Sequence, residues 1–138
     1  MANADGADLT FVSEEGTAEQ IRAATGGRGA DVVIDCVGAD ATLAMGAAAA
    51  RQLGDLTIVG IAGGTLPISF FSIPYEVSVQ TTYWGGRQEL VEVLSLGGRG
   101  LIQSRITTYP LGDAMKAYED LKAGEIEGRA VVVPNEAA

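Results

Sequence analysis

The sequence of 138 residues contains no histidine and a single cysteine, Cys36. Histidine is the usual general base near neutral pH, so its absence removes the commonest acid–base catalyst. One cysteine cannot form a disulfide within the chain, and a zinc site built from this chain alone would lack the usual nitrogen and sulfur ligands. We therefore predict no catalytic residue and no metal site in this chain, and we expect a reducing, cytoplasmic setting.

Positive charge and long apolar runs are also scarce. Nine lysines and arginines stand against 18 acidic residues, which gives a formal net charge of −9, and the basic residues do not cluster. Such a chain is poorly suited to the phosphate backbone of a nucleic acid. No apolar run reaches the roughly 18 residues that span a bilayer. We expect neither a nucleic acid nor a membrane as a partner.

The residues that are present indicate a globular α/β domain, because 47% are hydrophobic and 19 are glycines. Apolar and helical spacings predict strands near residues 8–12, 30–37, 55–61, 76–84, 102–108 and 128–134, and helices near residues 17–25, 41–52, 87–96 and 111–123. Thr17 and Asp40 are expected to cap the first two helices, and Gly54 to stop the second. This alternation favours parallel strands joined by right-handed crossovers.

The run ADVVIDCVG, residues 30–38, is almost continuously apolar before it ends in Asp35, Cys36 and Gly38. A half-exposed strand would alternate, so the run predicts a strand covered on both faces, whose carboxyl end faces a ligand crevice. One interpretation of Asp35 is the phosphoacceptor of a receiver-type domain, but the required lysine is missing from TIVGIAGG. For Cys36 alone we favour a core position, because nothing nearby in the sequence stabilises a thiolate.

Four segments follow one another in a distinctive order. They are TGGRGADVVIDCVGADATL (25–43), GDLTIVGIAGG (54–64), TTYWGGRQELVEVLSL (81–96) and YPLGDAMKAYEDLKAGEIEGRAVVVP (109–134). Together they resemble the C-terminal part of zinc-type medium-chain alcohol dehydrogenases, from about residue 6 to residue 134. The resemblance implies a partial doubly wound, Rossmann-like parallel sheet that lacks its first strands. It assigns residues 1–100 to a partial dinucleotide-binding domain, and residues 101–138 to a strand–helix–strand tail that packs toward the absent catalytic domain.

The sequence departs from that family in what precedes these segments. It has no counterpart of the catalytic domain with its zinc ligands, of the glycine-rich pyrophosphate turn or of the acidic ribose-binding residue. The resemblance therefore implies the C-terminal part of an enzyme that uses NAD or NADP, zinc and an alcohol or aldehyde, inactive as this chain alone. A truncated gene product, a split gene and a wrongly assigned start all stay open. The alternative function is a non-catalytic remnant that binds partner subunits and has little nucleotide affinity.

The resemblance also assigns cofactor contacts to the ends of three strands and to the tail. These are Cys36, Val37 and Gly38, then Val59, Gly60 and Ile61, then Tyr83, Trp84 and Gly85, and finally Arg129. In the family the four groups lie against the adenosine and ribose, the nicotinamide ring, its carboxamide and the pyrophosphate, which a guanidinium suits well. Each group also has a structural interpretation as a tight turn, ordinary packing or a solvated surface.

Two strands are expected to have open edges. In the family's strand order, 3-2-1-4-5-6, the missing strands leave ADVVIDCV as an apolar edge with no guarding lysine or proline. We predict that the chain alone is poorly stable, oligomerises or needs a complementing partner. The segment from Tyr75 to Thr82 resembles the strand by which two subunits of the family pair across a twofold axis. We therefore expect a homo-oligomer such as a dimer.

Overall fold

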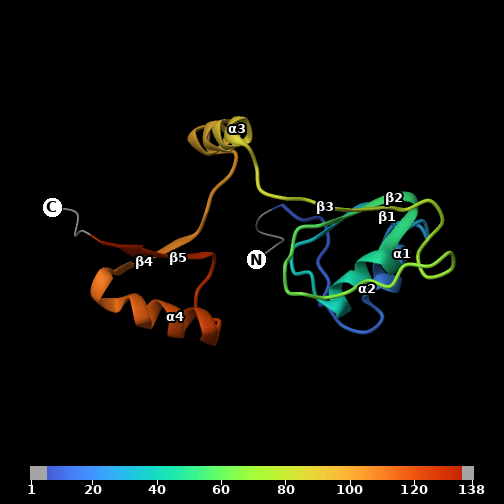
Figure 1. Ribbon diagram of the computed structural model, residues 1–138, viewed down its shortest axis with the longest axis horizontal. Helices are drawn as coiled ribbons and strands as arrows, with labels where there is room; N and C mark the ends of the chain where they lie inside the picture. Colours follow the sequence, from blue (N-terminus) through green and yellow to red (C-terminus); the bar gives the residue numbers. More distant parts are fainter. Residues whose placement is uncertain (1–5, 135–138) are drawn as a thin grey trace. The chain divides into compact units, whose positions relative to one another are not determined.

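A computed structural model describes residues 6–134 (Figure 1). The chain divides into two compact units, with the boundary between Trp84 and Gly85. The first unit contains α1 (Thr17–Ala24), β1 (Ala30–Asp35), α2 (Asp40–Ala49), β2 (Ala50–Ile58) and β3 (Ser78–Thr81). The second contains α3 (Arg87–Gly98), β4 (Ile106–Pro110), the 3-10 helix η2 (Leu111–Asp113), α4 (Ala114–Ala123) and β5 (Arg129–Val133). Residues 1–5 and 135–138 lie outside the described residues.

The first unit is built on a parallel sheet in the order β1-β2-β3. Helix α2 crosses from β1 to β2 and packs on both strands, and α1 packs on α2 (Figure 1). Gly46 allows the close approach of α2, because a Cβ there would lie only 3.2 Å from Val33 Cγ1 and 3.4 Å from Leu56 Cδ1. Leu56 is fully buried beneath the helix. The α/β class with parallel strands is therefore confirmed.

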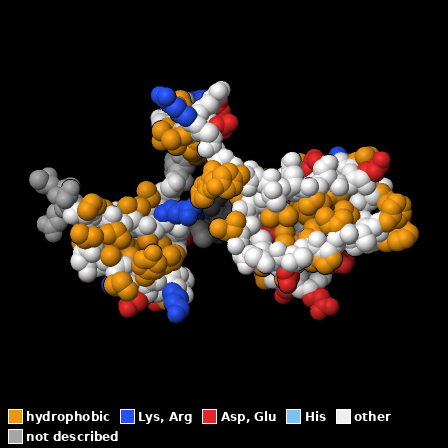
Figure 2. Space-filling model, viewed as in Figure 1, with side chains coloured by type: hydrophobic (Ala, Val, Ile, Leu, Met, Phe, Trp, Pro, Cys, Tyr) orange, Lys and Arg blue, Asp and Glu red, His pale blue; other side chains and the backbone are white. Residues whose placement is uncertain are grey.

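No helix within residues 6–84 covers the other face of this sheet. Val32 pairs with Asp55 and Ile34 with Thr57, so alternation places these side chains opposite the Val33 and Leu56 face. Val32 is 58% exposed and Ile34 is 61% exposed. The prediction that this strand is covered on both faces is therefore wrong for the described chain, because α1 and α2 lie on one face. Exposed apolar side chains are also visible in the space-filling view (Figure 2).

The strand β1 lies at an edge of the sheet, as the missing strands predict. Within residues 6–134 it pairs only with β2, and β3 forms the opposite edge. The β1 strand is shorter than the predicted 30–37, because the chain turns after Asp35. The edge is apolar at Val32 and Ile34, so it has the properties of an unguarded pairing surface.

Several predicted boundaries in the first unit are wrong. The strand predicted at 55–61 is β2 at Ala50–Ile58, and the strand predicted at 76–84 is β3 at Ser78–Thr81. Residues 8–12 form no strand, α2 ends at Ala49, and Gly54 lies inside β2 instead of stopping a helix. The pairing of β1 with β2 jumps from Ala30–Ala50 to Val32–Asp55, and Leu53 has a φ of 59°. A Cβ on Gly54 would lie 2.9 Å from the carbonyl oxygen of Arg51, so glycine accommodates this bulge.

The two predicted helix caps have other partners. Thr17 is the first residue of α1, after an N-cap at Gly16, and its hydroxyl donates to the Val12 carbonyl at 2.6 Å. Asp40 is the first residue of α2, and its Oδ1 accepts the backbone N–H of Thr65 at 2.6 Å. Both side chains therefore hold neighbouring loops, which helical spacing alone does not reveal.

The second unit contains a parallel pair, β4 and β5, with α4 packed beside it. The strand predicted at 102–108 begins only at Ile106. Tyr109 donates its hydroxyl to Asp120 Oδ2 at 2.9 Å, and Lys116 Nζ lies 2.7 Å from the same oxygen. The hydrogen bond from Tyr109 ties α4 to β4, whereas Lys116 and Asp120 both belong to α4. None of the helices within residues 6–134 is long and apolar enough to cross a membrane.

Candidate functional site

The predicted cofactor residues of the first unit lie at the carboxyl ends of its strands. Because β1, β2 and β3 are parallel, these ends meet at one edge of the sheet. The turn after β1 and the turn after β2 run side by side and are joined by backbone hydrogen bonds. The carbonyl oxygen of Asp35 accepts the N–H groups of Val59 (2.8 Å) and Gly60 (2.9 Å). The carbonyl oxygen of Val37 accepts the N–H of Ala62 (3.1 Å), and that of Gly38 accepts the N–H of Gly64 (2.8 Å). The fold thus brings Cys36, Val37 and Gly38 beside Val59, Gly60 and Ile61.

Glycine is required where these two turns touch. A Cβ on Gly60 would overlap the carbonyl carbon and oxygen of Val37, and a Cβ on Gly38 would overlap the carbonyl oxygen of Gly60. Gly38 also has a φ of 73°, which side chains rarely adopt. The contact between the two turns therefore explains both glycines without a ligand.

Asp35 holds the first of these turns in place. Its Oδ1 accepts the N–H groups of Val37 at 2.7 Å and Gly38 at 3.0 Å, and its Oδ2 accepts the Thr42 hydroxyl at 2.9 Å. Burial opposes the charged form, but these three hydrogen bonds outweigh it and hold the pKa of Asp35 below its ordinary value. With its side chain bonded and the residue only 5% exposed, Asp35 acts as a structural clasp rather than as an accessible phosphoacceptor.

The side chains that leave these two turns are exposed and mostly apolar. Val37 and Val59 are about half-exposed, and Ile61 is 94% exposed. Cys36 is exposed too, so the core position favoured for it is wrong. The reason is local: β1 ends at Asp35, and the turn that Asp35 clasps begins at Cys36. The result is an apolar, solvent-facing surface at the carboxyl edge of the sheet.

The third strand ends in two exposed aromatic side chains. Thr82 N–H donates to the Ile58 carbonyl at 3.2 Å, which extends the pairing of β3 with β2 by one residue. Tyr83 follows, and Trp84 is 81% exposed. Their ring centroids lie 6.0 Å apart in an edge-to-face arrangement. These rings belong to the first unit, at the end of a strand that adjoins β2.

Gly85 and Arg129 belong to the second unit. Gly85 directly precedes the N-cap of α3, and a Cβ there would lie 3.3 Å from the Cβ of Glu89. Arg129 begins β5, is exposed, and donates its backbone N–H to the Arg105 carbonyl at 2.9 Å.

The residues do not fit the zinc ion that the family resemblance implies. Residues 6–134 contain no group of three or more histidine, cysteine, aspartate or glutamate residues placed to hold a metal. The chain has no histidine at all. No chemical step of this chain can therefore be derived through a metal bound by its own residues.

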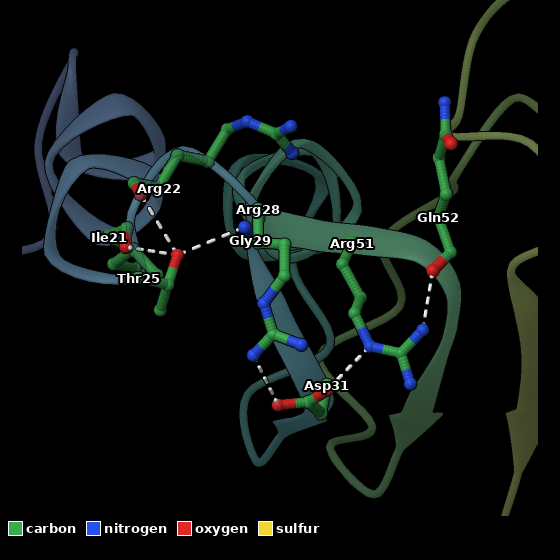
Figure 3. Close-up of polar contacts among 8 residues, drawn as sticks. All are labelled: Ile21, Arg22, Thr25, Arg28, Gly29, Asp31, Arg51 and Gln52. Atoms are coloured by element: carbon green, nitrogen blue, oxygen red, sulfur yellow. Dashed lines mark hydrogen bonds and ion pairs between the residues drawn. The ribbon is translucent and has the colours of Figure 1, made fainter.

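Arg28, Asp31 and Arg51 form a polar cluster at the amino ends of β1 and β2, which was not predicted from the sequence. Asp31 lies between two guanidinium groups, 2.5 Å from Arg51 Nε and 3.4 Å from Arg28 (Figure 3). The hydrogen bond from Arg51 and the charge of Arg28 hold the pKa of Asp31 below its ordinary value. Nearby, the Thr25 hydroxyl accepts the Gly29 N–H at 2.9 Å (Figure 3). The cluster stabilises the start of β1. In the sequence, only the i, i+3 spacing of Arg28 and Asp31 indicates it.

Comparison with known proteins links this geometry to one family. Residues 1–98 match the family model described as zinc-binding dehydrogenase. The chain is 33% identical to an NAD-dependent alcohol dehydrogenase of Sulfolobus acidocaldarius over 132 residues, which cover 92% of this chain and 37% of that protein. It is 32% identical to a D-arabinose 1-dehydrogenase (NADP(+)) of Saccharolobus solfataricus over 131 residues, or 94% of this chain and 37% of that protein.

Similarity to solved structures supports the same family as the sequence relatives. The crystal structure of an alcohol dehydrogenase from Aeropyrum pernix matches with a TM-score of 0.86 and 32% identity, covering 96% of this chain and 39% of that one. The chain thus spans little more than a third of the length of these relatives. It belongs to the zinc-binding dehydrogenase family and corresponds to a C-terminal, coenzyme-domain portion of its alcohol dehydrogenases.

Proposed function

We propose that this chain forms the C-terminal part of the coenzyme site of an NAD(P)-dependent alcohol dehydrogenase. The observation that carries the proposal is the apolar surface of Val37, Val59 and Ile61 at the carboxyl edge of the parallel sheet. Open α/β sheets bind ligands at that edge, and ligand sites are lined mainly by apolar groups. The named activities of the relatives, with NAD in one and NADP in another, support a nicotinamide coenzyme as the ligand.

The proposed contacts follow the order of the strands. Cys36, Val37 and Gly38 would lie against the adenosine and ribose, and Val59, Gly60 and Ile61 against the nicotinamide ring. Tyr83, Trp84 and Gly85 would hold the carboxamide, and Arg129 the pyrophosphate. A bound coenzyme supplies hydride acceptance and donation. The residues of this chain only bind and orient it, so the chain alone is proposed to be inactive toward an alcohol or aldehyde.

We also propose how the chain is divided between domains, how it pairs with a second copy and where in the cell it works. Residues 1–100 would serve coenzyme binding, and residues 101–138 would pack toward a catalytic domain. The segment from Tyr75 to Thr82 contains β3, whose outer edge is unpaired within the described sheet. We propose it as the pairing edge of a homodimer in a cytoplasmic enzyme.

A second candidate function is a non-catalytic subunit-interaction module. The two open edges of the described sheet, at β1 and β3, favour it, because unpaired strands recruit other chains. Under this alternative the coenzyme surface would be present but would have little affinity for nucleotide.

The single tryptophan makes the coenzyme proposal directly testable. Trp84 lies within the proposed site, so bound NADH or NADPH should quench its emission by energy transfer during a titration. We expect saturable quenching, weakened by Ile61→Lys and unchanged by Leu90→Lys, which alters an exposed apolar residue of α3. Thermal unfolding should be measured in parallel. With NADH at about 100 times its dissociation constant, the free energy of unfolding should rise by roughly 2.7 kcal/mol. Quenching that rises linearly without saturation, with an unmoved melt, would favour the non-catalytic alternative.

A further inference from the structure

A groove of about 410 Å³ lies between α1 and the outer face of α2. Ala41, Ala44, Met45 and Ala48 of α2 line one side of it. The loop that leads into α1 and the first turn of α1 form the other side. None of the proposed coenzyme residues lines this groove, so it is a separate surface.

Helix α2 is apolar on nearly all sides, although half of it faces solvent. Its buried side contains Leu43, Gly46 and Ala47, and its exposed side contains Ala41, Ala44 and Ala48. A helix that is apolar all round is normally covered all round. The groove positions follow the spacing i, i+3, i+4 and i+7, which makes a stripe about 10 Å long. The small side chains would let the backbone of another helix approach closely.

The rim of the groove is acidic. Glu14, Glu15 and Glu19 line it, and none of them forms an ion pair with another residue of the described part of the chain. The nearest cation along α1, Arg22, is engaged elsewhere, because its guanidinium donates to the carbonyl oxygen of Ala50 at 3.0 Å. A ligand for this groove therefore needs an apolar face flanked by positive charge.

We propose that the groove docks a cationic amphipathic helix of a partner protein. The apolar face of that helix would lie on the alanine stripe of α2, and its lysines or arginines would face Glu14, Glu15 and Glu19. Insertion of an amphipathic helix into an apolar groove is a recurrent mode of recognition. A second copy of this groove is the poorer occupant, because it would bring Glu14, Glu15 and Glu19 of one molecule against the same carboxylates of the other.

The test uses the 138-residue chain and two synthetic helical peptides of about 14 residues. Both peptides have leucines at i, i+3, i+4, i+7 and i+11, one with flanking lysines and the other with glutamates in their place. Fluorescence anisotropy of the labelled peptides measures binding. We expect saturable binding of the lysine peptide only, and weaker binding as salt rises and screens the rim charges.

Matched variants locate the binding site. Ala44→Gln adds bulk to the groove without changing charge and should weaken binding about tenfold, whereas Ala23→Gln, on an exposed part of α1 outside the groove, should not. Glu15→Gln and Glu19→Gln should each weaken it about two- to fivefold, the usual range for an exposed ion pair. Glu119→Gln, an exposed charge on α4, controls for net charge.

Several results would overturn the proposal. Equal binding of both peptides, or of neither, would remove the predicted ligand chemistry. Equal effects of Glu15→Gln and Glu119→Gln would show attraction to net charge alone, and equal effects of Ala44→Gln and Ala23→Gln would place the peptide elsewhere. If sedimentation shows a dimer that Ala44→Gln dissociates, the occupant of the groove is a second copy instead.

Discussion

Replacement of Gly60 by alanine tests whether backbone contact between two turns holds the carboxyl edge of the sheet together. The added Cβ would overlap the carbonyl group of Val37, so one turn must move. Movement would break the hydrogen bonds from Ala62 to Val37 and from Gly64 to Gly38, each worth about 0.5–1.5 kcal/mol. With residual crowding of about 1 kcal/mol, the expected loss is about 2–4 kcal/mol.

That loss is large for the first unit. At roughly 0.05–0.15 kcal/mol per residue, its 84 residues would have a stability of about 4–12 kcal/mol. The midpoint of thermal unfolding should fall by roughly 10–30 °C. Urea unfolding followed by Trp84 emission gives the free energy independently, because Trp84 belongs to this unit.

The matched control is Gly98→Ala at the end of α3. A Cβ at Gly98 meets nothing within 4 Å, so this change should be neutral or stabilise by up to about 1 kcal/mol. If Gly60→Ala unfolds within about 0.5 kcal/mol of the unmodified chain, the two turns do not touch as described, and the steric reasoning fails.

Three further predictions concern the clasp, the second unit and the open edge. Because the pKa of Asp35 in the folded chain lies below its unfolded value of 3.8, its stabilisation is complete above that value and disappears as pH falls through the folded pKa. The urea midpoint should therefore drop as pH falls below about 4, and Asp35→Asn should flatten that drop. Tyr109→Phe removes the hydrogen bond to Asp120 and should cost about 0.5–1.5 kcal/mol in unfolding of the second unit, with Tyr118→Phe, an exposed tyrosine, as control. Val32→Lys places a charge on the uncovered face beside the β1 edge and should shift sedimentation toward monomer with little change in melting; an unchanged distribution would mean that this edge does not self-associate.

The coenzyme surface illustrates how one sequence pattern serves two purposes. Gly38 and Gly60 match positions where the family's backbone approaches the cofactor, yet the fold already requires both for contact between the turns. Glycine at these positions therefore does not distinguish a working site from an inherited fold. The exposed side chains of Val37, Val59 and Ile61 are more informative, because burial within this chain does not explain them.

The sequence by itself determined the α/β class, the parallel strands and the family. The spacing of apolar residues and the local composition can be read from a short stretch of sequence. The strands around Val33 and Leu56 and the helix around Leu90 could therefore be predicted. The edge position of β1 could be predicted as well, because it follows from which segments of the family the sequence contains.

Only the tertiary structure decided where individual side chains go. Asp35 became a clasp because Val37, Gly38 and Thr42 present donors to it from a turn and a helix. That same turn places Cys36 in solvent. Thr17 and Asp40 hold loops instead of capping helices, since their partners come from other parts of the chain. Burial on both faces failed for β1 because an apolar strand needs a layer on each side, and α1 and α2 supply only one.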